Sequence, residues 1–276
     1  MGRYRTKTDG YESGYESDGE TKYSPVKKLG EGEFSTARLF KSESNKSVVV
    51  LNPLTTPGDM KEAEVKHRFF KRIYPDQTSY LFEIAEGDYR LVVPHVPYVS
   101  YEDLTIDTQE LQRILFHSAA QALKDCHDKE IVVIDLKMDN IYFDAKTQKS
   151  YFIDGVFSAL KGTTIDPFVF QKESPEVVAQ FKTEYEYIPP ECWSVEPVPV
   201  LATPEMDIYA LGILMDDLLK ESDSQVKLLI SRCLNKDPMS RPTLGEILAF
   251  LDELTSAASK PDSDSDAEFG AISRFK

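Results

Sequence analysis

Apolar residues recur along this chain either in short runs, which are typical of buried strands, or at helical spacing. Between residues 61 and 74, Val65, Phe69 and Ile73 follow one another at intervals of four, which predicts one apolar face of a helix. Pro75 ends the pattern, because proline cannot continue a helix.

Two candidate strand segments flank a turn that contains two glycines. Residues 27–29 and 37–40 stand on either side of Gly30-Glu31-Gly32, and this arrangement predicts strand, loop and strand. Two later apolar runs, 131–133 and 151–153, are followed by polar residues, the first after Ile134 and the second at once. These runs predict strands whose ends carry polar side chains.

The polar residues after these two runs are suited to one kind of chemistry. Asp135, Lys137 and Asn140 follow the first run, and Asp154 follows the second. Two carboxylates and an amide can hold a divalent cation against a polyphosphate while Asp135 orients a hydroxyl. Phosphoryl transfer needs little beyond such positioning and charge neutralisation. An ordinary strand–turn–strand with solvated charges gives the same short pattern, so other segments must decide.

These residues resemble motifs of the protein kinase family. Residues 134–140 resemble its catalytic loop, H-R-D-L-x-x-x-N, and Asp154-Gly155-Val156 resembles D-F-G. Further matches follow in the family's order: 29–37 the Gly-rich loop, 89–97 the strand and hinge, 187–191 the A-P-E segment, 207–212 the buried helix below the catalytic loop, and 233–243 the segment with the structural Arg.

The resemblance implies an α+β fold with two lobes, a β-rich N-lobe and a mainly helical C-lobe. The kinase-like domain is expected over residues 23–256, with the N-lobe at 24–93, the hinge at 94–97 and the C-lobe at 98–256. Residues 1–22 are expected to be a disordered acidic leader that contains tyrosines, and residues 257–276 a flexible acidic tail.

It also implies a nucleotide site between the lobes. Gly30 and Gly32 would let the backbone approach the phosphates, and the C=O of Pro94 and the N–H of Val96 would hold adenine. Glu64 is the best match to the family's ion-pairing Glu on the N-lobe helix.

The catalytic roles carry over residue by residue. Asp135 would orient the acceptor hydroxyl and Lys137 would steady the transferring phosphate, while Asn140 and Asp154 would bind Mg²⁺ or Mn²⁺. In addition, the resemblance predicts a buried ion pair between Glu191 and Arg241.

The chain departs from the family's pattern at several of these places. Asn52 stands where the strand lysine that holds the phosphates is expected, so its role in nucleotide binding is weakened; Lys41, Lys46 or Arg38 are open as substitutes. The His and Arg of the catalytic loop are Val133 and Ile134. Gly155 replaces the D-F-G Phe, and Phe157 is the residue expected to fill its place.

The composition restricts which partners and which location are expected. The net charge of −15 argues against nucleic acid and favours a basic protein substrate. The sequence contains no apolar run long enough for a membrane span, and three scattered cysteines fit a cytoplasmic location. Eukaryote-like C-lobe motifs beside an eroded N-lobe resemble kinases that bacterial pathogens deliver into the host cytosol. The departures also leave room for an activating partner or small molecule.

The sequence therefore predicts a divergent, ATP-dependent protein kinase that transfers the γ-phosphate to a protein hydroxyl. Two alternatives stay open at this point. One is a pseudokinase that scaffolds or regulates a partner, and the other is a kinase-fold enzyme that transfers AMP.

Overall fold

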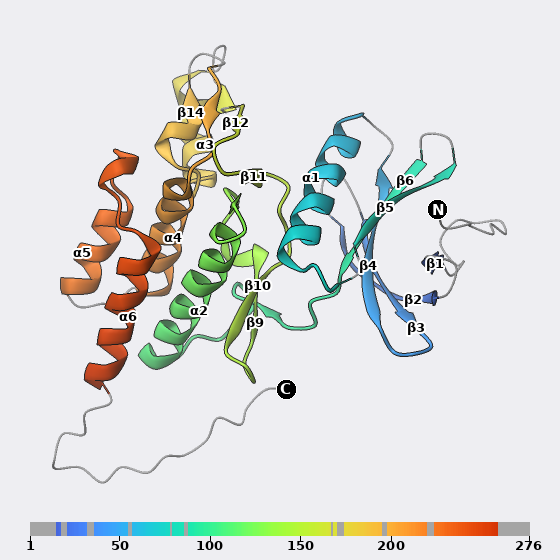
Figure 1. Cartoon of the computed structure of the whole chain (residues 1–276). Coiled ribbons are helices and arrows are strands. Elements are labelled where there is room, and N and C mark those ends of the chain that lie inside the picture. Colours follow the sequence, from blue (N-terminus) through green and yellow to red (C-terminus); the bar gives the residue numbers. More distant parts are fainter. Residues whose placement is uncertain are drawn as a thin grey trace, which may run out of the picture.

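The computed structural model describes residues 15–17, 21–31, 36–54, 57–77, 79–85, 88–166, 168–169, 174–194, 198–219 and 224–258. They form two lobes, a sheet with one helix and a larger helical body, joined by a single crossing of the chain after the last strand of the sheet (Figure 1). This is the two-lobed kinase fold that the sequence predicts.

The N-lobe is built on one antiparallel sheet. Its strands are β1 (Tyr15–Ser17), β2 (Thr21–Glu31), β3 (Thr36–Ser42), β4 (Ser47–Leu54), β5 (Tyr80–Ala85) and β6 (Asp88–Pro94). They lie in the order β1-β2-β3-β4-β6-β5. The short strand β1 pairs with the start of β2, so this part of the expected leader has a regular structure.

The apolar run in β4 lacks alternation because both faces of the sheet are covered. Val49 belongs to the main core together with Leu91 and Val93, on the side of helix α1 (Pro57–Ile73). Val48 and Val50 point to the other face, into a smaller cluster that includes Tyr23. Successive side chains of a strand alternate between faces, so each face receives its own set of apolar residues.

The C-lobe is mainly helical. Its helices are α2 (Gln109–His127), α3 (Pro175–Glu184), α4 (Pro204–Leu218), α5 (Ser224–Cys233) and α6 (Leu244–Ala258), with short 3-10 turns η1 (Met138–Asn140), η2 (Pro190–Cys192) and η3 (Pro238–Ser240). Thr108 caps α2, because its side chain accepts a hydrogen bond from Leu111 N at 3.2 Å. Helix α4 is buried along most of its length.

Short strands place the loops between the lobes. They are β7 (Val99–Ser100), β8 (Ile131–Val132), β9 (Ile141–Asp144), β10 (Lys149–Phe152), β11 (Ala159–Leu160), β12 (Thr164–Ile165), β13 (Phe168–Val169), β14 (Trp193–Ser194) and β15 (Val200–Leu201). The hairpin of β9 and β10 lies beside α2 on the side that faces the N-lobe (Figure 1). Both predicted strand runs, at 131 and 151, thus end at the boundary between the lobes.

None of the helices that the structure describes combines the length and the apolar character needed to cross a bilayer.

An ion pair ties the segment that contains Glu191 to the rest of the C-lobe. Arg241 donates to both carboxylate oxygens of Glu191, at 2.6 and 2.7 Å, and also to the carbonyls of Glu205 and Asn235. The Arg241 side chain is fully buried, while that of Glu191 is 18% exposed. The predicted pair is confirmed.

Replacing Arg241 is expected to destabilise the protein strongly. Arg241→Ala leaves Glu191 and two carbonyls without their donor, which should lower the free energy of unfolding by about 3–5 kcal/mol in chemical denaturation. Arg232 is the matched control, since its contact with Glu246 is long at 3.5 Å and exposed. Arg232→Ala should change stability by less than about 0.5 kcal/mol, and equal losses in both variants would contradict this role.

Candidate active site

The loop that carries Asp135 is held through its backbone. Asp207, at the start of α4, accepts hydrogen bonds from Val133 N at 2.8 Å and Ile134 N at 2.7 Å. His127, at the end of α2, lies with Nε2 2.8 Å from the same carboxylate. Ile134 has φ of 68°, a left-handed conformation that is unfavourable for a β-branched residue. Asp207 thus holds a strained turn immediately before Asp135.

Asp135 is buried, and one of its two carboxylate oxygens is fixed. Oδ2 accepts from Asn140 Nδ2 at 2.7 Å, and the backbone carbonyl of Asp135 accepts from the same amide at 3.2 Å. Oδ1 is buried and has no partner in full hydrogen-bond geometry within the described part of the chain, although the Tyr187 hydroxyl interacts with the carboxylate. Burial raises the pKa of Asp135, and the charge of Lys137 and the hydrogen bond of Tyr187 oppose this shift without reversing it. Asp135 is therefore a stronger base than an ordinary aspartate.

Asp154 reaches the same place from the end of β10. Ile153 N donates to the carbonyl of Asn140 at 3.1 Å, which brings the two loops together. One oxygen of Asp154 accepts from Val156 N at 2.9 Å, and the other accepts from Lys66 Nζ on helix α1 at 2.8 Å. The structure thus brings the loops of Asp135, Asn140 and Asp154 together.

Lys137 lies on the outer side of this group. Its Nζ is 3.4 Å from Asp139 Oδ2 and 5.8 Å from the centre of the Tyr187 ring. Burial acts to lower the pKa of Lys137, but the negative charges of Asp135 and Asp139 outweigh it, and the pKa is raised. Burial, and then the charge of Asp135, also raise the pKa of Tyr187. Lys137 therefore stays cationic close to Asp135.

Phe69, on helix α1, fills the place expected for the D-F-G Phe. A Cβ built on Gly155 would lie 2.3–2.7 Å from carbons of the Phe69 ring. Phe69 is 1% exposed, whereas Phe157 is 46% exposed. The expectation that Phe157 fills this space is therefore wrong. The aromatic ring that fills this space comes from helix α1, and Gly155 leaves room for it because glycine has no side chain.

The predicted nucleotide contacts are described only in part. Gly30 is exposed near the end of β2 and is paired with Ala37, whereas Gly32 lies outside the described residues. Asn52 is paired with Thr36, but its side chain lies outside the description. At the hinge, Pro94 ends β6 and is followed by half-buried Val96.

Glu64 does not enter the site. Its side chain is exposed, and no ion pair joins it to another residue in the described part of the chain. Lys66, two residues on, is the charged residue of α1 that reaches Asp154. Sequence reasoning missed Lys66, although one signal was available: it stands three and four residues before Phe69 and Phe70, which are both buried. A lysine on that face of the helix must lie near the core.

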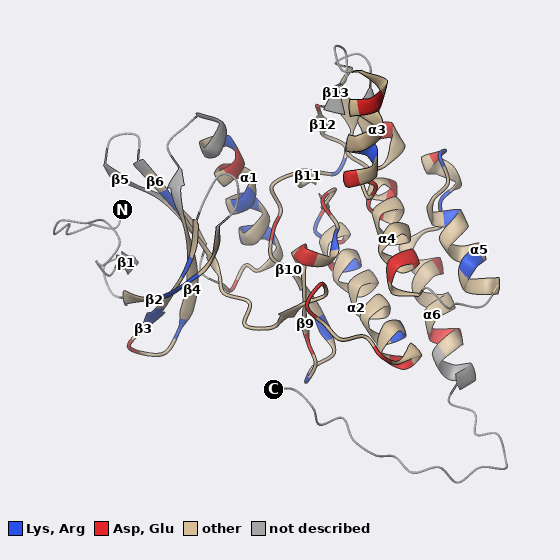
Figure 2. Cartoon of the chain, turned by 180° about the vertical axis from the view of Figure 1, so that it is seen from behind, with Lys and Arg blue, Asp and Glu red and all other residues tan. Residues whose placement is uncertain are grey.

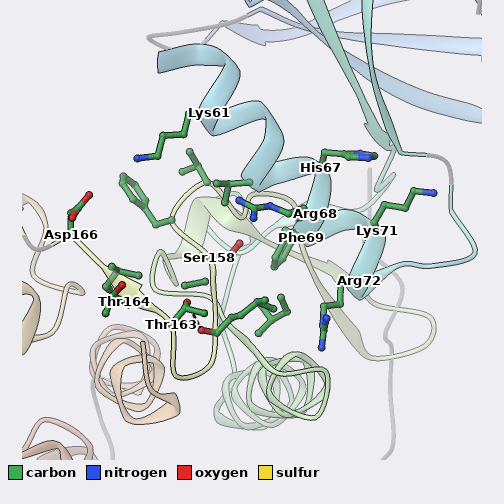
Figure 3. Close-up of a pocket in the computed structure, with 17 residues that line it drawn as sticks. Lys61, His67, Arg68, Phe69, Lys71, Arg72, Ser158, Thr163, Thr164 and Asp166 are labelled. Carbon is green, nitrogen blue, oxygen red and sulfur yellow. Dashed lines mark hydrogen bonds between the residues drawn. The ribbon is translucent and has the colours of Figure 1, made fainter. Parts of the chain in front are cut away.

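A pocket of about 710 Å³ opens on another side of α1. Figure 3 shows Arg68 directed into it from the helix, with Ser158, Thr163 and Thr164 of the segment after Asp154 on the opposite wall, while His67 and Lys71 point away. Basic residues are conspicuous on this helix in the charge view (Figure 2). Asp135, Asn140 and Asp154 do not line this pocket, although Phe69 and Val156, which lie beside that group, do.

Comparison with known proteins agrees with this arrangement. A family model of the protein kinase domain matches residues 23–223, which is most of the chain. The chain therefore belongs to the protein kinase family, whose members typically use ATP and a divalent metal. Among curated proteins, a search finds no match.

Because Gly155 lies close to the Phe69 ring, we expect a methyl group added at residue 155 to destabilise the protein. Gly155→Ala should lower the free energy of unfolding by about 1–3 kcal/mol, because the ring of buried Phe69 has to move. Adding Phe69→Leu should recover part of that loss in a double-mutant cycle. Gly245→Ala is the control: its Cβ would meet nothing closer than 3.8 Å, and alanine favours the helix by up to about 1 kcal/mol. Destabilisation by Gly245→Ala, or none by Gly155→Ala, would contradict this packing.

The raised pKa of Asp135 predicts a pH-dependent cost to stability. Its folded pKa lies above the unfolded value, so at neutral pH the buried carboxylate disfavours folding, and this cost disappears as the pH falls through the folded pKa. Asp135→Asn should therefore raise the melting temperature at neutral pH by about 2–4 °C, which corresponds to about 1 kcal/mol.

The gain in melting temperature from Asp135→Asn should be smaller at acidic pH, where Asp135 of the wild type is protonated. Asp139→Asn, on the exposed side of the same loop, serves as the control and should show no such trend. A gain from Asp135→Asn that is the same at every pH would argue against a buried charge as its cause.

Proposed function

We propose that this chain is an active protein kinase that transfers the γ-phosphate of ATP to a hydroxyl of a protein substrate. The observation that carries the proposal is the state of Asp135. Its carboxylate is buried, one oxygen is fixed by Asn140, and the other has no described partner in full hydrogen-bond geometry, although the Tyr187 hydroxyl is close enough to interact with the carboxylate. A buried acceptor without a partner is costly, which favours a role in binding an incoming donor.

The acceptor hydroxyl of a substrate is such a donor. Asp135 would accept its hydrogen bond, orient its oxygen and take its proton as the new bond to phosphorus forms. The raised pKa supports this role, because it makes the carboxylate a better base. Lys137, held cationic beside Asp135, would stabilise negative charge on the transferring group.

Asn140 and Asp154 suit a hard cation such as Mg²⁺ or Mn²⁺, because both offer oxygen ligands. Among the described residues no cluster of three or more His, Cys, Asp and Glu side chains could hold a metal by itself. This fits a cation held partly by the phosphates of ATP, whose charge such a cation neutralises when bound. Gly30, Gly32, Asn52, Pro94 and Val96 remain the proposed contacts to the nucleotide.

A basic substrate is supported by charges beside the catalytic loop. A small hollow next to Lys137 is lined by Glu184, Glu186 and Asp217. These carboxylates would attract lysine or arginine side chains that flank the acceptor hydroxyl, in line with the net charge of −15.

One observation favours the pseudokinase alternative. Lys66 pairs with Asp154 at 2.8 Å and so already neutralises the carboxylate that would bind metal. In a scaffold that never binds nucleotide, this pair would help to hold the two lobes together.

Labelled ATP separates these functions. The full chain is incubated with Mg²⁺, histones as basic substrate and ATP labelled at either the γ- or the α-phosphate. We expect transfer of the γ-label only, and a loss of about 100-fold or more in Asp135→Ala and Asp154→Ala. Asp125→Ala, an exposed carboxylate on α2, is the control and should transfer at the wild-type rate.

Each other outcome has a distinct meaning. Transfer of the α-label would identify an AMP transferase. Absence of transfer, together with no thermal stabilisation by millimolar ATP and Mg²⁺, would identify a pseudokinase. Full transfer by Asp154→Ala would refute the assigned role of that residue.

A further inference from the structure

In the family pattern a strand lysine supplies the positive charge of the nucleotide site, and a glutamate on the helix is its partner. Strand β4 and helix α1 of this chain differ from that pattern. Residues 47–54 of β4 include no lysine, and the register places Asn52 opposite Thr36, close to the glycine turn. Glu64, the expected acidic partner of a strand lysine, is exposed. The cation that does reach the site is Lys66 of α1, with Nζ 2.8 Å from Asp154 Oδ2.

The substitutes considered from the sequence are less well placed. Lys41 is exposed and pairs with Ser24, near the end of β2 that is remote from Gly30. Lys46 is exposed in the turn between β3 and β4. Arg38 pairs with Val50, two positions before Asn52, and takes part in another interaction.

Lys66 is fixed in its position by a second contact on the same helix face. Phe69 follows three residues later and packs against Gly155, while Lys66 binds Asp154. Residues three apart on a helix are neighbours, so two consecutive residues of the loop meet two neighbouring residues of α1. The Lys66 side chain is 19% exposed and that of Asp154 is 26% exposed, which leaves both accessible to a ligand.

We propose that Lys66 binds the phosphates of the nucleotide, so that helix α1 supplies the charge that β4 lacks. An ammonium group has three donors, and Asp154 occupies one of them. The carboxylate beside it is the proposed ligand of a cation that bridges phosphate oxygens, so the remaining donors lie where phosphates must come. This inference rests on the proposed function, because it concerns the same site.

Binding measurements on the full chain test the role of Lys66 without relying on activity. Lys66→Met should raise the dissociation constant of Mg²⁺-ATP about 10- to 100-fold, as expected for a lost charged hydrogen bond, and leave that of adenosine within twofold. Lys66→Arg should retain most of the affinity for Mg²⁺-ATP. Lys71→Met, an exposed lysine of the same helix, is the matched control and should bind like the wild type.

A merely structural role for Lys66 gives a different result. It would weaken adenosine and Mg²⁺-ATP alike, or lower the melting temperature without changing either affinity. Wild-type affinity for Mg²⁺-ATP in Lys66→Met, or a loss of affinity in Arg38→Met instead, would overturn the inference.

A labelling experiment needs no variant and so covers the case in which Lys66→Met does not fold. An acyl-phosphate derivative of ATP transfers its acyl group to an amine beside the terminal phosphate. Peptide mapping of the wild-type chain should find Lys66 acylated, and an excess of ATP should protect it. ATP-protected labelling of Lys41 or Lys46 without Lys66 would overturn the inference.

The failure of this inference can be told apart from the failure of the proposed function. If the wild-type chain binds no Mg²⁺-ATP at millimolar concentration, both are wrong. If the wild type and Lys66→Met both bind Mg²⁺-ATP and transfer the γ-label equally, only the role of Lys66 is wrong.

Discussion

The active-site loop depends on a single buried carboxylate. Asp207 is fully buried, and its two oxygens receive the N–H groups of Val133 and Ile134 and face His127. Without these bonds the left-handed turn at Ile134 would have nothing to offset its strain. Because Asp207 binds main-chain atoms, its hold on the loop does not depend on the side chains at 133 and 134, which are themselves buried among apolar residues. This explains how two apolar residues can replace the family's His and Arg while Asp135 keeps its place.

The general architecture could be predicted because it follows from the order of the motifs along the chain and from the pattern of apolar residues. The strand runs, the helix at 57–73 and the pair of Glu191 and Arg241 each match the expectation closely. The observed boundaries of α1 differ from the predicted ones by only a few residues, and β1 is a short strand within the expected leader.

The charges on α1 could not be predicted in the same way. Spacing shows which residues share a helix face, but the rotation of the helix about its axis is set by packing against distant residues. Glu64 and Lys66 are two positions apart, about 200° around the helix, so they point in nearly opposite directions. The contact of Phe69 with Gly155 fixes that rotation and brings Lys66 inward. A loop glycine more than eighty residues away in the sequence, together with the other buried residues of α1, thus helps to set which charge of the helix faces the site.

One consequence of this arrangement concerns control. Helix α1 carries both the cation that pairs with Asp154 and the ring that packs on Gly155. A displacement of the helix would break the ion pair with Asp154 and the packing on Gly155 together, since both contacts lie on the same helix face within a single turn. A binding protein that grips the outer side of α1 would therefore act as an on–off control, with few half-active forms in between.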